Sequence, residues 1–421
     1  MEKAQAQTPF QRFRNFIPKS ILSLKAGYSF AFFRKDLIAG ISVGVIAFPL
    51  AMAYAIGADL PPERGLFTAI VAGFLISALG GSRVQIGGPT GTMIVVLYGL
   101  IMQKGLDNMI VAALLAGVIL ICFGLSGLGT YIKYIPYPVI TGLTTAIACL
   151  IFTSQMKDLF GFAIEKSSVD FLGKWHSYFT HFSSLDPKPL IVGLGTLAII
   201  IYFRRYKPHF PGVLIALATA GFVTWFFHID IATIGSEFGT LPRTLPAPSL
   251  PSFTFEQALS LLPDAFTIAL LAAIESLLAA IVSEGMTGWR YQSNCELVAQ
   301  GIANIGSILF GGIPAAGALA RTAANVKSGA RTPVAGMVCA VVVFVIMYFF
   351  APLTSKIPLC ALSAVLLMIA WGMSEIHHFF HLFSAPKRDV IVLVTVFLLT
   401  LFANITVAVQ IGMILAAFLF M

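Results

Sequence analysis

Charged residues are scarce in this chain. It has 421 residues, of which only 10% are Asp, Glu, Lys or Arg and 58% are hydrophobic. A soluble domain needs far more polar surface, so the composition excludes one and indicates a polytopic membrane protein. The formal net charge of +8 does not indicate nucleic-acid binding. The basic residues lie in short loops between apolar runs, as they do in the cytoplasmic loops of membrane proteins.

Cysteine is scarce too. The chain has five cysteines and no CxxC pair, and all five fall in apolar stretches or at their edges: Cys122, Cys149, Cys295, Cys339 and Cys360. We therefore predict small buried hydrophobic residues rather than metal ligands or disulfides. We expect no metal site and no cofactor. No nucleophile–base pairing is apparent either, so an enzyme is not expected.

Long apolar runs account for most of the sequence. A membrane-spanning helix needs about 20 apolar residues. Runs that fit this rule lie near 36–57, 64–80, 107–129, 136–157, 188–203, 211–228, 263–284, 295–310, 333–351, 358–373, 388–403 and 405–421. Two further segments, near 84–103 and 311–328, are interrupted by Gly and Pro. The prediction is an all-α membrane protein with 14 transmembrane segments.

The loop charges predict the orientation. The first 35 residues carry seven basic side chains and are placed in the cytoplasm: Lys3, Arg12, Arg14, Lys19, Lys25, Arg34 and Lys35. If segments are counted from a cytoplasmic N-terminus, nine more basic residues also fall on the cytoplasmic side: Lys133, Arg204, Arg205, Lys207, Arg290, Lys327, Arg331, Lys387 and Arg388. Loops 161–187 and 229–260 then lie outside. We expect the inner (plasma) membrane of the cell, with both termini cytoplasmic.

The two interrupted segments share a pattern. Residues 86–93 read IGGPTGTM, and residues 311–334 read GGIPAAGALARTAANVKSGARTPV. Each is the third segment of seven, and an odd number of segments per half inverts the second copy in the membrane. Asp36 opens one half and Asp264 the other, which supports two inverted 7-segment repeats. Such paired interruptions indicate a binding site at mid-membrane.

The chemistry of these segments indicates an anion. A helix that begins inside the bilayer leaves its first N–H groups without intrahelical partners. Pro89 and Pro314 cost few hydrogen bonds at such a start. Two N-termini that face each other would present partial positive charge and free donors, to which Thr90 and Thr92 could add. Arg321 would contribute a full positive charge. A plain packing kink is the alternative.

Glu275 is the other charge inside the predicted membrane region. A charge at mid-span costs about 2.5–3.5 kcal/mol and indicates function by default. A desolvated carboxyl suits a proton carrier. The alternative is a structural salt bridge, with Arg321 as its partner.

Glu284 and Glu296 lie near segment ends and are expected to face the cytoplasm. Lys157, Asp158 and the aromatic loop around Trp175 suggest an interfacial belt. Unwound backbone at Pro49, within the first segment, would expose further polar groups beside the site.

Several stretches together resemble a known family. DLIAGISVGVIAFPLAMAYA (36–55), IGGPTGTM (86–93), IESLLAA (274–280) and residues 294–333 are similar to the SulP anion transporter family, the sulfate permease-like proteins. The resemblance implies a uracil-permease-like fold with half-helices as spans 3 and 10. It implies a cytoplasmic segment (1–35), a core domain of spans 1–4 and 8–11 (36–130 and 263–352), and a gate domain of spans 5–7 and 12–14 (131–262 and 353–421). Members usually continue into a cytoplasmic STAS domain, so this chain, which stops at Met421 in an apolar run, looks truncated before it.

The resemblance also implies a site between the starts of spans 3 and 10. The substrate-binding positions are Leu50, Tyr54, Gly88, Pro89, Thr90, Gly317, Ala320 and Arg321, with Glu275 for the coupling ion. Many members have Gln where this chain has Leu50, which removes one polar contact. Sodium-coupled members carry Asp on span 8 with Thr one turn later, whereas Ala279 follows Glu275 here. The prediction therefore favours a coupling proton over sodium.

The prediction is a secondary active transporter of a small anion, such as bicarbonate, sulfate, chloride or a dicarboxylate. Its partners would be the anion, a proton, the lipid bilayer and a second copy in a homodimer, and it would work by elevator-type motion of core against gate. An anion channel, a sodium-coupled anion symporter and a nucleobase–proton symporter remain as alternatives. Arg321 and the lack of a Glu in span 10 argue against the last of these.

Overall fold

The computed structural model describes residues 16–132, 136–162, 164, 170–207, 210–403 and 405–420. The basic residues Lys3, Arg12, Arg14 and Lys133, on which part of the predicted orientation rests, lie outside the described residues. Their cytoplasmic placement stays a prediction.

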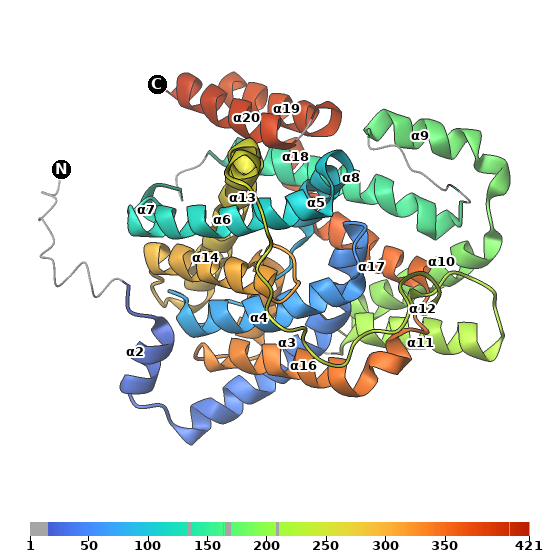
Figure 1. The fold of residues 1–421 in the computed structure, drawn as a ribbon, viewed down its shortest axis with the longest axis horizontal. Helices are drawn as coiled ribbons and strands as arrows, with labels where there is room; N and C mark the ends of the chain where they lie inside the picture. Colours follow the sequence, from blue (N-terminus) through green and yellow to red (C-terminus); the bar gives the residue numbers. More distant parts are fainter. Residues whose placement is uncertain are drawn as a thin grey trace, which may run out of the picture.

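Helices make up most of the described chain, and a helix lies in each predicted segment (Figure 1). The helices are α2 (Lys19–Lys25), α3 (Phe30–Gly57), α4 (Pro62–Leu79), α5 (Gly91–Lys104), α6 (Leu106–Leu125), α7 (Gly129–Ile132), α8 (Tyr137–Phe160), α9 (Phe171–Thr180), α10 (Pro187–Tyr206), α11 (Gly212–Phe226), α12 (Ile234–Phe238), α13 (Phe255–Thr287), α14 (Ser293–Leu309), α15 (Leu319–Lys327), α16 (Val334–Thr354), α17 (Leu359–Met373), α18 (Ile376–Leu382), α19 (Lys387–Phe402) and α20 (Ile405–Phe420). A short 3-10 helix, η1 (Phe182–Ser184), and two strands, β1 (Gly87–Gly88) and β2 (Ala316–Gly317), complete the elements.

Eight helical stretches of the described chain are long and apolar enough to cross a membrane. They include α3, α4, α6, α8, α10, α13 and α16, together with residues 359–382. Helices α5, α11 and α20 are apolar but shorter. The two helices that follow the Gly-Pro interruptions are short, as expected of half-helices: α5 has 14 residues and α15 has nine.

Two helices begin earlier than predicted. Helix α3 begins at Phe30 because the Ser29 hydroxyl accepts a hydrogen bond from the Phe32 N–H and caps the helix. Helix α13 begins at Phe255 because Thr254 and Gln257 form a reciprocal capping box. Asp36 and Asp264 therefore lie inside helices and do not open them. Helix α3 also continues through Pro49 without unwinding.

The helices pack in two sets. In the first, α3 packs against α4 and α16, α14 packs against α4 and α6, and α13 packs against α6 and α15. In the second, α8 packs against α17 and α19, α10 packs against α11 and α17, and α19 packs against α20. Helices from the first and last thirds of the sequence are thus interleaved, as the adjacent α3, α4 and α16 show in Figure 1. The strands lie within the first set, where β1 contacts α4 and β2 contacts α13.

The cysteines follow the prediction only in part. Cys295, Cys339 and Cys360 are buried and Cys149 is half-buried, whereas Cys122 on α6 is exposed. Because α6 is one of the helices able to cross a membrane, an exposed apolar thiol there is compatible with contact to lipid.

Asp36 ties α3 to the loop that precedes α16. Its carboxylate is fully buried. One oxygen accepts hydrogen bonds from the backbone N–H groups of Arg331 (2.7 Å) and Thr332 (3.1 Å). The other accepts from the hydroxyls of Thr332 (2.6 Å) and Tyr28 (3.0 Å). A buried carboxylate is tolerated when it is hydrogen-bonded in this way, and its partners in turn depend on it.

We predict that Asp36→Ala lowers the free energy of unfolding by about 3 kcal/mol, because it leaves buried donors without an acceptor. Asp264→Ala is the matched control. Asp264 pairs with Lys104 at 2.6 Å, but both side chains are partly exposed, so its loss should cost less than about 1 kcal/mol. Thermal unfolding of both variants in detergent checks this. Equal losses would contradict the role assigned to Asp36.

Candidate functional site

The two interrupted segments meet at a short antiparallel strand pair. Gly87 pairs with Gly317 and Gly88 with Ala316. The Ala318 N–H donates to the Ile86 carbonyl oxygen at 2.8 Å, which extends the pairing by one bond. All of these positions are buried. Helices α5 and α15 therefore begin from neighbouring points inside the helix bundle, which agrees with the expectation of two facing helix starts.

Glycine is required at two positions of this crossing. Gly88 has a φ of +143°, a conformation that residues with a side chain rarely adopt, and a Cβ there would crowd the Arg321 guanidinium. A Cβ on Gly317 would overlap the Gln85 side chain and the backbone of Ser276. The Gly residues thus permit the close approach of the two segments and of α13.

Buried side chains complete the hydrogen bonding of the interrupted backbone. The Gly317 N–H donates to the Ser276 hydroxyl at 2.8 Å, and the Ile86 N–H donates to the Thr322 hydroxyl at 3.1 Å. The Asn304 amide bonds both the N–H and the C=O of Ala315, each at 2.9 Å. Since irregular backbone at membrane depth must find partners within the protein, these side chains make the crossing possible.

The starts of both short helices have no side-chain cap. Thr90 occupies the N-cap position of α5, with φ −129° and ψ 159°, but its hydroxyl does not accept from the first turn. Ala318 occupies that position in α15 and has no polar side chain. The first N–H groups of both helices are thus available to an external acceptor, and both helix dipoles place partial positive charge there.

Arg321 adds a full charge at the crossing. Its side chain is only 4% exposed and donates from Nη2 to the Pro89 carbonyl oxygen. Its Nε–H has no hydrogen-bond partner. Among the described residues no ion pair joins Arg321 to Glu275 or to another carboxylate. The structural salt bridge that was the alternative for Glu275 is therefore not formed in the described structure, and no carboxylate is paired with the guanidinium.

Glu275 instead contacts Thr90. The Thr90 hydroxyl donates to the Glu275 carboxylate at 2.6 Å, and the Thr92 hydroxyl lies 3.3 Å from that of Thr90. Glu275 is half-buried on α13, so part of its surface reaches open space. Thr90 therefore directs its hydroxyl at Glu275 instead of capping α5. This hydrogen bond connects Glu275, the residue predicted for coupling, with Thr90, a residue predicted for substrate binding.

The remaining predicted residues border the same region. Tyr54 on α3 is buried, and the charges of Arg321 and Glu275 both act on its hydroxyl. Leu50, one turn earlier, is half-buried. Ala320 and its neighbour Leu319 are exposed at the start of α15. The start of α15 therefore faces open space, while Arg321 behind it is enclosed.

Glu296 departs from its prediction. It does not face the cytoplasm at a segment end but is fully buried in the first turns of α14. Its carboxylate accepts from the backbone N–H groups of Gly81 (2.9 Å) and Ser82 (3.1 Å) and from the Gln300 amide (2.9 Å). It thereby holds the turn that follows α4 and leads into β1.

Sequence reasoning missed the residues that hold the crossing together. Glu296, Gln300, Asn304 and Ser307 are all fully buried. They recur every three or four residues, so they form one polar stripe along α14. That periodicity inside an otherwise apolar helix could have identified them, because a stripe of buried polar groups needs partners.

Comparison with known proteins identifies the family. The model of the sulfate permease family matches residues 33–396. The "Putative sulfate transporter YvdB" of Bacillus subtilis (strain 168) is 42% identical over 391 residues, which are 93% of this chain and 74% of that protein.

Solved structures share the fold. The transmembrane domain of the cyanobacterial bicarbonate transporter BicA matches with a TM-score of 0.79 and 29% identity, covering 93% of this chain and 98% of that one. The murine Slc26a9 anion transporter in its inward-facing state matches with a TM-score of 0.88 over 100% of this chain and 73% of that one, at 19% identity. From the family match over most of its length, and from the fold that agrees with it, we conclude that this chain belongs to the sulfate permease family.

Proposed function

We propose that this protein is a secondary active transporter of a small anion, which binds where α5 and α15 begin. One observation carries the proposal: two uncapped helix starts and an arginine without a carboxylate partner converge at one buried crossing. Backbone N–H groups, helix dipoles and a guanidinium are the groups that proteins use to bind anions.

The names of two similar proteins indicate which anions to test first. YvdB is named as a "Putative sulfate transporter" and BicA as a bicarbonate transporter. Both anions carry several oxygens that can accept from the N–H groups of two helix starts. Chloride and dicarboxylates are compatible with the same donors, so a radiotracer uptake panel in proteoliposomes is the direct way to choose among the four.

The packing supports an elevator mechanism. The set formed by α3–α6 and α13–α16 corresponds to the proposed core, and the set formed by α8, α10, α11, α17, α19 and α20 to the proposed gate. Both helix starts and Glu275 belong to the core set, so a bound anion would move with the core. Each of the two inverted 7-segment repeats would supply four spans to the core and three to the gate. The protein would lie in the inner membrane as a homodimer with cytoplasmic termini.

Glu275 is the proposed coupling group. A proton on this carboxyl would change its bond to Thr90, which stands at the start of α5. Sodium coupling is less well supported, since Ala279, one turn later on α13, offers no oxygen ligand. A nucleobase symporter is disfavoured because α15 carries Arg321 and no carboxylate. A channel would be distinguished by flux that neither saturates nor concentrates the anion.

We predict that Arg321→Ala weakens anion binding roughly ten- to hundredfold, because a charge-assisted hydrogen bond is worth about 1.5–3 kcal/mol. Arg321→Lys, which keeps the charge, should lose less. Concentration-dependent uptake in proteoliposomes measures the effect.

Lys327→Ala is the control for Arg321. Lys327 lies on the same helix but is exposed in its last turn, so its removal should leave affinity unchanged. A folded Arg321→Ala protein with native affinity would remove Arg321 from the site.

We predict that Glu275→Gln abolishes accumulation driven by a proton gradient but keeps exchange of anion for anion, because Gln retains shape and hydrogen bonding but cannot titrate. Uptake and counterflow with and without an imposed pH gradient measure the two activities. Glu284→Gln, on the same helix near its end, should remain coupled. Wild-type uptake that ignores pH and follows sodium would contradict proton coupling.

A further inference from the structure

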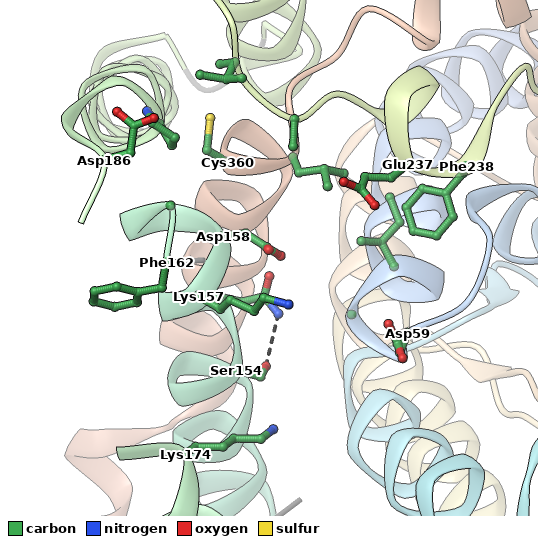
Figure 2. A pocket seen from close by; sticks show the side chains of 18 of the residues that line it. Asp59, Ser154, Lys157, Asp158, Phe162, Lys174, Asp186, Glu237, Phe238 and Cys360 are labelled. Carbon is green, nitrogen blue, oxygen red and sulfur yellow. Dashed lines mark hydrogen bonds between the residues drawn. The ribbon is translucent and has the colours of Figure 1, made fainter. Parts of the chain in front are cut away.

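A large cavity lies away from the proposed transport site. Its volume is about 820 Å³. It opens between the end of α3 and α5 on one side and α8, α9 and α10 on the other (Figure 2). A second cavity of about 520 Å³ adjoins it. Neither cavity is lined by Thr90, Glu275 or Arg321. Whatever these cavities bind is therefore distinct from the anion bound at the strand crossing.

Lys174 stands where the two cavities meet. It lines both of them, together with Gly57, Tyr98 and Ser154. The side chain extends from α9 into the space between α8 and the end of α3, as Figure 2 shows. It is only 7% exposed, and its ammonium lies 4.3 Å from the centre of the Tyr98 ring.

The ammonium of Lys174 lacks a polar partner. In the part of the chain that the structure describes, it donates no hydrogen bond and forms no ion pair. An ammonium offers three donors, and a ring face satisfies its charge only in part. The side chain as a whole is buried but borders both cavities, so the position is suited to an acceptor that reaches the ammonium from there.

The nearby charges limit which acceptor fits. Five carboxylates also line the larger cavity: Asp59, Asp158, Asp186, Asp230 and Glu237. In Figure 2, Asp186 and Glu237 lie at the far end of the view from Lys174. Lys157 also lines this cavity, so five carboxylates face two ammonium groups. A dianion doubles both its attraction to Lys174 and its repulsion by the carboxylates, but removing it from water costs far more, which favours a monovalent anion.

We propose that Lys174, over the Tyr98 ring, forms a second anion-binding site that takes a small monovalent anion. Lys174 belongs to α9 and Tyr98 to α5, so the anion would sit between the proposed gate and the half-helix that carries the transport site. The proposal concerns binding and does not require that the protein transports an anion.

The site should depend on pH. Burial lowers the pKa of Lys174 to about 8, and the charge of Asp59 opposes this shift. The ammonium is therefore present below pH 8 and lost above it, so anion binding should weaken as pH rises through about 8. The other titratable groups around it are Tyr98, Lys157 and Asp158 in the larger cavity and Lys104, Asp170 and Asp264 in the smaller one.

Chloride-dependent thermal stabilisation of the purified chain tests the proposal. Chloride replaces gluconate at constant ionic strength, so general screening does not change. The measurement uses Arg321→Ala, which removes the proposed transport site, and is repeated in the wild type in case that variant does not fold. Adding Lys174→Met should weaken the apparent chloride affinity about tenfold or more, with Lys174→Gln as a second neutral variant. Sulfate should stabilise less than chloride.

Lys104→Met is the matched control. Lys104 also lines the smaller cavity, but its ammonium is already paired with Asp264 at 2.6 Å. Its removal should leave the chloride response intact. Between pH 7 and 9 the chloride affinity should fall about tenfold with Lys174 and stay constant in Lys174→Arg, whose charge persists.

Three results would overturn the proposal. One is an unchanged chloride response in both neutral Lys174 variants. Another is an equal loss in Lys104→Met, which would indicate a general charge effect. The third is a Lys174–Asp59 pair formed in solution, which would appear as equal, non-additive destabilisation by Lys174→Met and Asp59→Asn. If the wild type transports no anion but Lys174-dependent chloride binding persists, only the proposed function fails.

Discussion

The structure depends on one constraint: backbone polar groups inside an apolar bundle must find partners within the protein. The chain breaks two helices in its interior, and each break exposes N–H and C=O groups. Some of these groups hydrogen-bond to one another, because the two breaks form a strand pair through Gly87, Gly88, Ala316 and Gly317. Side chains from α13, α14 and α15 form hydrogen bonds with other backbone groups of the two breaks. The helix starts that remain uncapped, on α5 and α15, are then positioned to bind a ligand.

The sequence predicts the breaks but not how they are held. Gly-Gly followed by Pro, as GGP at residues 87–89 and GGIP at residues 311–314, shows where the helices are interrupted, because no long apolar helix accommodates that combination without cost. The pairing of residue 87 with residue 317 is a tertiary contact between distant segments, and nothing local encodes its register. Asn304 was not singled out, and Glu296 was expected to face the cytoplasm, because the sequence around them reads as an ordinary apolar segment. Their periodic spacing with Gln300 shows that the information was present in the sequence.

Charged residues near helix ends were harder to interpret, because their environment depends on packing. Lys157 and Asp158 suggested an interfacial belt, which stays a prediction, and the structure shows that they line the larger cavity with Lys174. Asp36 suggested the first residue of a segment, yet it is the buried acceptor for the loop before α16. In both cases the same residue type is also common at a membrane interface or at the start of a helix, so its identity alone does not reveal its environment. Only the neighbouring helices determine which role applies.

Under the proposed function, the hydrogen bond between Thr90 and Glu275 would join anion binding to proton coupling in one physical step. While Glu275 is ionised it accepts a hydrogen bond from the Thr90 hydroxyl, and its negative charge lies next to the start of α5. An anion that approaches α5 is then repelled by that charge. A proton on Glu275 would remove the repulsion, and because linkage is reciprocal each bound species would favour binding of the other. Because Arg321 is not paired with Glu275, this exchange requires no salt bridge to break. Such an arrangement would favour anion and proton bound together over either bound alone, which is the condition that the proposed symporter must satisfy.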